Sequence, residues 1–394
     1  MKTLLANRTS KKLQQAQSIA DLRKLAYARL PRAVFDFIDG GAASERTLRE
    51  NTSAFEDWLL MPRVGVDVSQ RNTKTSFLGK PSRFPFLFSP TGLAGVFWPH
   101  GEIAGARAAE RAGVPYCLST NSVASLEEVA KAVPGGDRWF QLYCLKDRDW
   151  MSQLLARAAQ ADYRVLCLTV DLPMTGRRER DARNAFTVPL RPRPSTVVNM
   201  ASRPGWLLGA MKSPPRFGNF ESGDKSGFTS VAQHVATLMD PSATWDDIAN
   251  VRDQWKGPMM LKGLLHPADA EKAVALGIDA VMVSNHGGRQ LDQAPASITA
   301  LPSVVSAVSG RAEVYIDGGI SRGTDILKAL ALGAHGAGMG RSMLWGLSAA
   351  GEQGLDRALD ILEQELDNSM ALLGVPDIQK ISDEFIIRRH ASLS

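Results

Sequence analysis

A histidine and an arginine follow one of the apolar runs of this sequence, in 281-VMVSNHGGRQLD-292. His286 can take a proton near neutral pH, and Arg289 can hold a carboxylate through two parallel hydrogen bonds. Gly287 and Gly288 stand between them and leave room for a small ligand. A histidine that only bonds a backbone carbonyl would leave the arginine and the glycines unexplained. The segment therefore indicates a site that binds a carboxylic acid and takes a proton from it.

Apolar runs of this kind, each followed by a polar joint and a helix-like segment, recur along the chain. Runs that are apolar at nearly every position are typical of parallel strands buried on both faces. Eight strand-helix units predict an α/β fold, a (β/α)8 TIM barrel, with a doubly wound sheet as the alternative. The runs are 84–90, 115–120, 139–144, 165–171, 259–263, 280–285, 314–319 and 336–341.

The polar residues that close these runs are the candidates for chemistry, because the active site of a barrel lies at the C-terminal ends of its strands. Every run contributes at least one. They are Ser89, Pro90, Thr91, Ser119, Thr120, Gln141, Tyr143, Thr169, Asp171, Lys262, Ser284, His286, Asp317, Gly340 and Arg341.

The last two units predict a phosphate site. DGGISRG (317–323) and GMGRS (338–342) place glycines before helices, where backbone N–H groups and the helix dipole favour an anion. Loops after the seventh and eighth strands commonly hold phosphate in this fold. Arg322 and Arg341 lie close by in sequence, so a phosphorylated ligand is expected here.

The chain divides into three parts in this interpretation. Residues 1–60 form a helical segment with helices that begin near Ser18 and Pro31 and end before Gly40. Residues 61–374 form the barrel, and residues 375–394 form a C-terminal tail. Residues 176–228 interrupt the barrel after its fourth strand, and a joint of this length is usually a lid or another functional loop.

The insertion is locally basic. Residues 177–216 carry nine Lys or Arg against two acids, and 206-WLLGAM-211 adds apolar side chains. This composition is typical of a segment that lies on a membrane surface, and equally of a solvated lid over an anionic substrate. Both interpretations stay open at the level of sequence.

Composition narrows the remaining classes. The 394 residues carry a net charge of +5, few aromatics and no nucleic-acid motif, so no nucleic-acid partner is expected. Cys117, Cys144 and Cys167 are isolated, which argues against a disulfide framework or a metal site. Neither a signal peptide nor an apolar run of about 20 residues is present. We expect a cytoplasmic protein, with peripheral attachment to the inner face of the cytoplasmic membrane as the alternative.

The motifs FQLY, LTVD, GRRERD, LKG, SNHGGRQLD, DGG and GR, in this order along the chain, resemble those of the FMN-dependent L-2-hydroxy-acid oxidases and dehydrogenases. This family includes glycolate oxidase, L-lactate dehydrogenase and mandelate dehydrogenase, and the resemblance to the last two is strongest. It extends from about Leu30 to the C-terminal helix. It implies an FMN cofactor, oxidation of a 2-hydroxy acid to a 2-oxo acid, and a homotetramer.

The resemblance also implies roles for single residues. His286 would be the catalytic base and Asp171 the carboxylate that orients it. Arg178 and Arg289 would bind the substrate carboxylate, and Tyr143 would contact the substrate hydroxyl. FMN would be held by Pro90, Thr91, Gly92, Ser119, Gln141, Thr169, Lys262, Ser284, Asp317, Gly318, Gly319, Ser321, Gly340 and Arg341, with Lys262 near the N1–O2 edge of the flavin.

Three substrate-side or phosphate-side positions depart from the family pattern. Phe37 stands where a tyrosine usually donates to the substrate carboxylate, and Asn121 stands where glycolate oxidases have tryptophan. Ser321 replaces a common arginine, so one phosphate contact falls to a hydroxyl or passes to Arg322. The loss of the phenol and the smaller residue 121 favour a mandelate-like or other bulky acid first and L-lactate second.

Two features of the sequence bear on the identity of the electron acceptor. Gly92 resembles the membrane-linked dehydrogenases, whereas the oxidases often have alanine, and the basic insertion fits a membrane surface. We therefore expect a quinone or a similar acceptor, with an oxygen-using oxidase that makes hydrogen peroxide as the alternative. A lyase with a Schiff base on Lys262 is the alternative from another class. A flavoenzyme for a modified peptide or amino-acid derivative, and a flavin-binding protein without turnover, also stay open.

Overall fold

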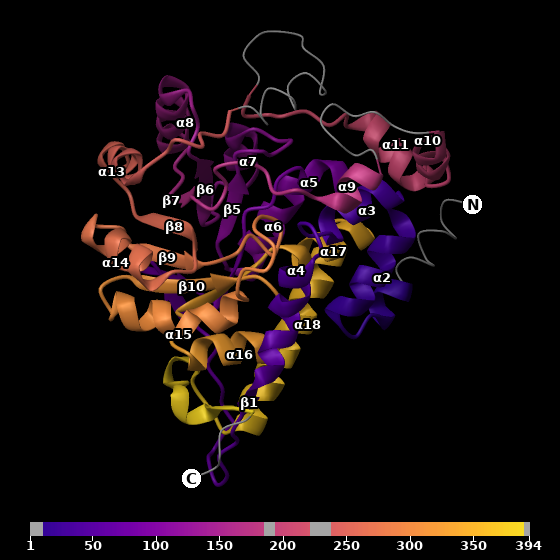
Figure 1. Cartoon of the computed structure of the whole chain (residues 1–394). Coiled ribbons are helices and arrows are strands. Elements are labelled where there is room, and N and C mark those ends of the chain that lie inside the picture. Colours follow the sequence, from indigo (N-terminus) through magenta and orange to yellow (C-terminus); the bar gives the residue numbers. More distant parts are fainter. Residues whose placement is uncertain (1–10, 185–193, 221–237, 390–394) are drawn as a thin grey trace.

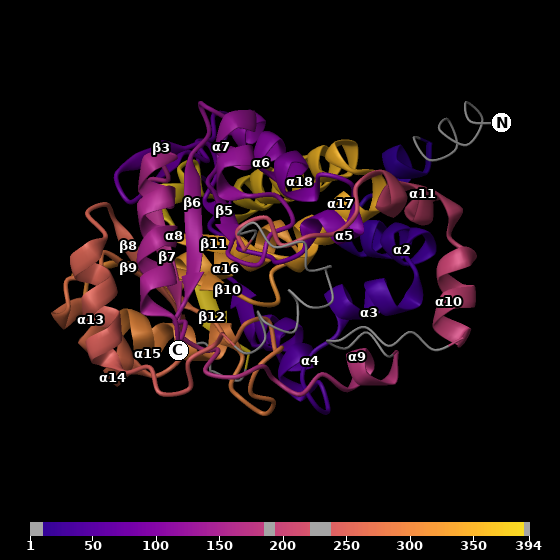
Figure 2. The same cartoon turned by 90° about the horizontal axis from the view of Figure 1, so that it is seen from above.

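The computed structural model describes residues 11–184, 194–220 and 238–389. Eight parallel strands close into a barrel in the order β4 to β11, and helices surround it (Figures 1 and 2). The prediction of a (β/α)8 barrel is confirmed, and each of the eight apolar runs overlaps one barrel strand. The strands are β4 (Phe86–Phe88), β5 (Tyr116–Ser119), β6 (Arg138–Tyr143), β7 (Val165–Thr169), β8 (Met259–Leu264), β9 (Ala280–Val283), β10 (Glu313–Asp317) and β11 (Gly336–Met339).

The outer helices alternate with the strands and bury one face each. Side chains cap several of them; Ser125, for example, forms a capping box with Glu128 at the start of α7. The helices that follow the strands are α5 (Ala94–Phe97), α6 (Gly101–Ala112), α7 (Leu126–Ala132), α8 (Arg148–Gln160), α13 (Trp245–Gln254), α14 (Pro267–Ala275), α15 (Ser297–Val308), α16 (Gly323–Ala331), α17 (Arg341–Ala350) and α18 (Glu352–Leu373).

A hairpin closes the end of the barrel opposite to the predicted site. It consists of β2 (Thr75–Phe77) and β3 (Lys80–Ser82), and its fully buried Phe77 ring lies 6.2 Å from Trp139 and 5.4 Å from Tyr315, centroid to centroid. Arg164, just before β7, donates to the carbonyls of Phe77 and Leu78. The apolar plug excludes water from this end and leaves the C-terminal ends of the strands as the open face.

The N-terminal segment forms short helices against the barrel. α2 (Ile19–Arg29) starts at Ser18, whose hydroxyl accepts from the Asp21 N–H at 3.2 Å. α3 (Arg32–Asp39) follows Pro31 and ends at Gly40, as the sequence predicted, and α4 (Arg46–Ser53) follows. α2 lies beside α17, and β1 (Trp58–Leu60) pairs with β12 (Ile386–Arg388) near the C-terminus (Figure 1). The predicted three-part division stays a prediction.

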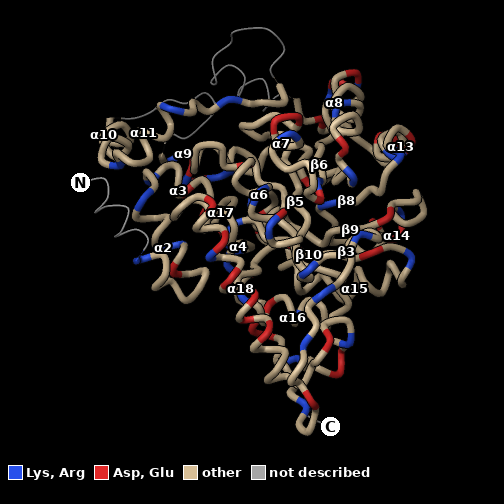
Figure 3. The backbone as a smooth tube through the Cα atoms, turned by 180° about the vertical axis from the view of Figure 1, so that it is seen from behind, with Lys and Arg blue, Asp and Glu red and all other residues tan. Residues whose placement is uncertain are grey.

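The insertion after β7 contributes three described helices. They are α9 (Glu179–Arg183), α10 (Pro194–Ala201) and α11 (Pro204–Lys212), and residues 185–193 and 221–237 of the insertion region lie outside the described residues. Basic positions are spread along its trace (Figure 3). The Trp206 indole of α11 donates to the Val96 carbonyl of α5 at 2.8 Å. The Arg32 N–H at the start of α3 donates to the Asn199 side chain of α10 at 2.6 Å.

Candidate active site

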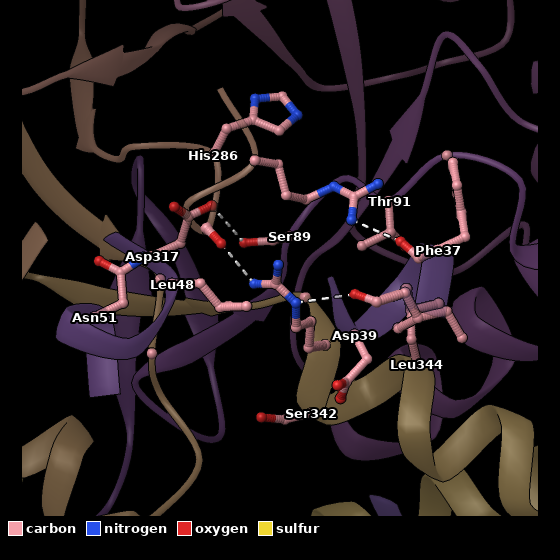
Figure 4. Close-up of a pocket in the computed structure, with 18 of the residues that line it drawn as sticks. Phe37, Asp39, Leu48, Asn51, Ser89, Thr91, His286, Asp317, Ser342 and Leu344 are labelled. Carbon is pink, nitrogen blue, oxygen red and sulfur yellow. Dashed lines mark hydrogen bonds between the residues drawn. The ribbon is translucent and has the colours of Figure 1, made fainter. Parts of the chain in front are cut away.

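A cavity of about 1200 Å³ opens at the C-terminal ends of the barrel strands. Most of the residues predicted from sequence line it, and Figure 4 shows several of them around the pocket. Five predicted residues are not in the wall but lie at the same strand ends. Ser119 donates to Gln141, Asp171 contacts His286, Ser284 accepts from Lys262, and Thr169 lies opposite Lys262 in the barrel register. Those in the wall are Phe37, Pro90, Thr91, Gly92, Asn121, Tyr143, Arg178, Lys262, His286, Arg289, Asp317, Gly318, Gly319, Ser321, Gly340 and Arg341.

His286 and Asp171 form a pair, although 115 residues separate them. The imidazole Nδ1 lies 3.0 Å from Asp171 Oδ1. His286 has a left-handed backbone with φ of 58°, and its N–H donates to Ser284 Oγ at 3.1 Å. If the neutral ring keeps its hydrogen on Nδ1, toward the carboxylate, Nε2 is the atom that remains to accept a proton.

Burial and charge set the protonation of this pair. Burial lowers the pKa of His286 below its ordinary value of 6.5, although the Asp171 carboxylate acts in the opposite direction. Burial raises the pKa of Asp171, but the charge and hydrogen bond of His286 outweigh it, and the pKa lies below 3.8. A neutral imidazole beside an ionised carboxylate is the state that a general base requires, because the carboxylate stabilises the imidazolium that forms.

Close packing keeps Asp171 in place. Gly263 has φ of 107°, and a Cβ added there would lie 2.6 Å from the Cβ of Asp171. Any side chain at residue 263 would therefore push the carboxylate away from the imidazole.

Two arginines lie around the ring of Phe37. The guanidinium carbon of Arg289 lies 5.0 Å from the ring centroid, and that of Arg178 lies 5.9 Å from it. Arg289 donates to the carbonyls of Phe37 at 2.6 Å and of Gly40 at 3.1 Å. Phe37 thus gives the arginines a cation–π contact where a tyrosine would also present a hydroxyl to the ligand.

The arginines form an electropositive end of the cavity. Burial, together with the neighbouring Arg178 and Arg341, holds the pKa of Arg289 well below its ordinary value. Burial also lowers the pKa of Arg178, and the Arg178 Nε atom is shut from solvent without a hydrogen bond to the described residues. A carboxylate bound here would offset the repulsion and satisfy this donor.

Lys262 lies within a buried polar chain at the ends of the strands. Its ammonium lies 3.1 Å from Asp317 Oδ2 and donates to Ser284 Oγ at 2.8 Å. The Ser89 hydroxyl donates to Asp317 at 3.2 Å (Figure 4). Burial lowers the pKa of Lys262, but Asp317 and Asp171 outweigh it, and the pKa is raised. A permanently protonated amine is a poor Schiff-base nucleophile, which argues against the lyase alternative.

Unpaired buried atoms at three strand ends test the fit of a flavin. Gln141 Nε2, Thr169 Oγ1 and Asp317 Oδ1 are shut from solvent without a hydrogen bond to the described residues. They lie on β6, β7 and β10, and buried polar groups in native proteins are nearly always paired. The pyrimidine edge of an isoalloxazine ring carries alternating acceptors and donors that match such a set, so the residues present fit FMN.

The glycines of the predicted phosphate site have the required geometry. Gly318 and Gly319 have φ of 97° and 86°, and a Cβ at Gly319 would lie 1.9 Å from the Asn51 carbonyl oxygen. Only glycine therefore fits where β10 turns toward α16. Both glycines line the cavity and leave backbone groups accessible to an anion.

The arginines near this end are held by other groups. Arg341 donates to the carbonyls of Ile38, Gly40 and Gly287 at 2.8–2.9 Å, and burial lowers its pKa to about 10. Arg322 pairs with Glu365 at 2.7 Å. Because Arg322 is engaged in this ion pair, the Ser321 hydroxyl is the simpler replacement for the phosphate contact that an arginine commonly makes in the family.

Sequence reasoning missed at least four residues of the cavity wall. Arg180 pairs with carboxylates of the N-terminal segment, and Asp181 is a wall residue whose pKa burial raises despite nearby Arg289 and Arg178. Phe217 and Met239 add an apolar wall. Arg180 lies in the GRRERD motif and could have been suspected, whereas no pattern in the irregular segment around residues 217 and 239 points to the cavity.

Comparisons with known proteins agree with this geometry. A model of the FMN-dependent dehydrogenase family matches residues 26–388. L-lactate dehydrogenase of Caulobacter sp. (strain K31) is 43% identical over 375 residues, which cover 94% of this chain and 98% of that protein. L-lactate oxidase of Nostoc sp. is 43% identical over 373 residues, with coverage of 94% and 97%.

A solved structure is similar over nearly the same length. The crystal structure of the monotopic membrane protein (S)-mandelate dehydrogenase superposes with a TM-score of 0.92 at 38% identity, covering 95% of this chain and 100% of that chain. These matches confirm the resemblance seen in the motifs, and the roles of single residues stay predictions. The chain belongs to the FMN-dependent dehydrogenase family.

Proposed function

We propose that this protein oxidises an L-2-hydroxy acid to the corresponding 2-oxo acid. The observation that carries the proposal is the placement of His286, paired with Asp171, and of Arg178 and Arg289 in the wall of one cavity. Bound FMN supplies the acceptor for the two electrons that leave the substrate. The pair and the arginines supply the proton transfer and the carboxylate binding.

The chain's own residues have separable tasks in this reaction. Arg178 and Arg289 hold the substrate carboxylate and so fix the orientation of its α-carbon. His286 Nε2 takes the proton, and Asp171 stabilises the imidazolium. Burial raises the pKa of Tyr143 to about 12, so its phenol stays protonated and can donate to the substrate hydroxyl. Lys262 presents a permanent positive charge to the cofactor.

The shape of the cavity favours a bulky substrate. Phe37, Phe97, Leu172, Phe217 and Met239 contribute apolar side chains to its wall. An apolar wall of this size stabilises a phenyl ring more than a methyl group, since buried apolar area sets the gain. We place a mandelate-like acid first and L-lactate second, and the relatives are named for both acids.

Replacement of the base tests the reaction. In His286→Gln we expect FMN to stay bound while anaerobic addition of (S)-mandelate or L-lactate no longer bleaches the flavin absorbance. His266→Gln is a matched control, because His266 is an exposed histidine at the start of α14. Bleaching of His286→Gln at the rate of the control would refute the role of His286.

The helices α10 and α11 support a peripheral membrane contact. Val198, Leu208 and Met211 are exposed apolar side chains, Met211 by 69%, and Arg203 and Lys212 add positive charge beside them. No helix among the described residues is both long and apolar enough to cross a bilayer. The monotopic solved structure supports a protein that lies on a membrane surface. We propose that this surface is the inner face of the membrane and that the electrons pass to a quinone.

A sedimentation assay with anionic liposomes tests this contact. Leu208→Ser/Met211→Ser should lower the pelleted fraction, whereas Val64→Ser, at a residue exposed by 94% elsewhere on the surface, should not. Equal pelleting of all three proteins would refute the membrane contact and favour a lid. Fast turnover with oxygen that releases peroxide, and little with a quinone analogue, would refute the acceptor and favour an oxidase, as the Nostoc relative is named.

The oligomer is part of the proposal. We propose a homotetramer, and light scattering of the purified holoenzyme measures its mass directly. A mass near 43 kDa, that of one chain, would refute it.

A further inference from the structure

We propose that Asn121 selects a 2-hydroxy acid whose aromatic side chain carries a hydroxyl group. This inference rests on the proposed function, because it names the substrate class of the same cavity. It starts from one side chain in the wall whose amide has no partner among the residues that the structure describes.

The backbone of Asn121 is fixed just beyond the end of β5. Its N–H donates to Ser119 Oγ at 3.2 Å, and its carbonyl accepts from the Leu93 N–H at 2.9 Å. The side chain lies beside Gly92, where an added Cβ would be 3.2 Å from the Cβ of Asn121. The amide is therefore held against the loop that lines the cofactor end of the cavity.

The amide itself is unpaired on both sides. Asn121 Oδ1 is shut from solvent and accepts no hydrogen bond from the described residues. The amide nitrogen donates to none of them either, yet it is not among the atoms shut from solvent, and the residue lines the cavity. An amide oxygen that is shut from solvent and has no partner is costly in a folded protein, so this group is poised for a ligand.

The amide shares its side of the cavity with an apolar wall. The Gly218 N–H donates to the Ser122 carbonyl at 3.0 Å, and the Asn219 side chain donates to the Thr120 carbonyl at 3.1 Å. These bonds bring residues 217–219 against the turn that carries Asn121, so Phe217 and Asn121 contribute to neighbouring parts of the wall. A phenyl ring against Phe217 would present a ring substituent to the amide.

A hydroxyl is the substituent that matches this amide. It can accept from the amide nitrogen and donate to the amide oxygen, whereas a hydrogen atom or a methyl group leaves both unpaired. A site built to hydrogen-bond a substrate hydroxyl discriminates strongly against the analogue that lacks it.

The test compares wild-type holoenzyme with Asn121→Leu and Asn121→Ala. Leucine keeps the branched shape of the side chain and removes the hydrogen bonds, and Asn250→Leu on the exposed side of α13 is the matched control. Flavin bleaching is measured with (S)-mandelate and with its 3-hydroxy and 4-hydroxy derivatives. The dissociation constants of benzoate and of 3- and 4-hydroxybenzoate are measured by the change in flavin absorbance, without turnover.

We expect wild type and Asn250→Leu to prefer at least one hydroxylated compound by about tenfold in both assays. Asn121→Leu and Asn121→Ala should lose this preference, so that the hydroxylated and the unsubstituted compounds differ by less than about twofold in each variant. Wild type without a preference, or a preference that survives in both Asn121 variants, would overturn the proposal. Weaker FMN binding with unchanged selectivity would also overturn it, because the amide would then serve the cofactor.

The two assays separate this proposal from the function on which it rests. If none of the mandelates bleaches the flavin, the proposed reaction fails for this substrate class. The benzoate affinities then still decide whether Asn121 recognises a ring hydroxyl.

Discussion

Arg180 joins the insertion to the N-terminal segment, and its removal should weaken both. Its guanidinium lies 3.2 Å from Asp39 Oδ2 and 3.7 Å from Asp36 Oδ1, and it also forms an ion pair with Glu45. α9 carries Arg180 two residues after Arg178, and α3 carries Asp36 and Asp39 on either side of Phe37. The ion pairs therefore hold Arg178, which is predicted to bind the substrate carboxylate, close to the ring of Phe37.

The expected loss in stability depends on the partners that each of the three carboxylates keeps when Arg180 is replaced. Asp39 keeps Arg23 at 2.6 Å and Asp36 keeps Arg32 at 2.7 Å, so neither becomes unpaired. Glu45 keeps only a backbone N–H. Breaking a fully buried ion pair by removing one partner costs about 3–5 kcal/mol. Because two carboxylates keep cations and the lost guanidinium is itself partly exposed, we expect Arg180→Met to lower the free energy of unfolding by roughly 2–3 kcal/mol.

The same helix offers a matched control. The Arg183 side chain is 71% exposed, against 30% for Arg180, and its ion pair with Glu179 lies on the surface. Exposed pairs contribute about 0–1 kcal/mol, so Arg183→Met should be nearly neutral. Urea unfolding of the holoenzymes at low and high salt measures the difference.

Arg180→Met should also raise KM for the acid more than it lowers kcat, because it loosens the segment that presents Arg178. Arg180→Lys should recover part of the effect, since a single ammonium can replace one of the ion pairs. Equal unfolding midpoints for the Arg180→Met and Arg183→Met proteins would refute the reasoning, and so would an unchanged KM.

Three further predictions concern the cavity. Since burial lowers the pKa of His286, the rate of flavin reduction should fall only below pH 6.5, where the imidazole becomes protonated. Asp171→Asn should shift this fall in rate to lower pH and slow flavin reduction at least about 100-fold. A wild-type rate that already falls above pH 6.5 would contradict this prediction. Lys262→Met leaves Asp317 without its cation, so the free energy of unfolding should drop by about 3 kcal/mol. FMN should also dissociate faster from this variant in fluorescence assays, and an unchanged rate of FMN dissociation would contradict the prediction. Phe37→Tyr adds a donor beside the arginines and should lower KM for L-lactate about tenfold in steady-state assays, whereas an unchanged KM would show that the phenol does not reach the carboxylate.

The barrel and much of the site could be predicted because both depend on local patterns. A strand buried on both faces is apolar along its whole length, and its C-terminal end can only point to the open face of the barrel. Asp171 and His286 could therefore be placed at one end of the molecule from sequence. Their 3.0 Å contact follows from β7 and β9 flanking β8, which no single segment encodes.

The rest could not be predicted because it depends on how irregular segments dock. The partners of Arg180 lie on α3, and their contacts exist only once that helix lies against α9. Phe217 reaches the cavity because backbone bonds hold its neighbours against the turn after β5. Neither arrangement has a sequence period that could predict it. Asn121 lies in the cavity wall, and its predicted role in substrate binding stays a prediction.

The carbonyls of α3 that hold Arg289 and Arg341 have a consequence for how the protein folds. Arg289 donates to Phe37 and Gly40 across 252 and 249 residues, and Arg341 donates to Ile38 and Gly40 across 303 and 301 residues. Contacts of such sequence separation form late, because the intervening chain must first be ordered. During synthesis the bonds from Arg341 to the carbonyls of Ile38 and Gly40 can form only after the eighth barrel strand, β11, has been made. Competence to bind the acid should therefore appear after the bulk of the secondary structure, as a slow phase that follows refolding seen by circular dichroism.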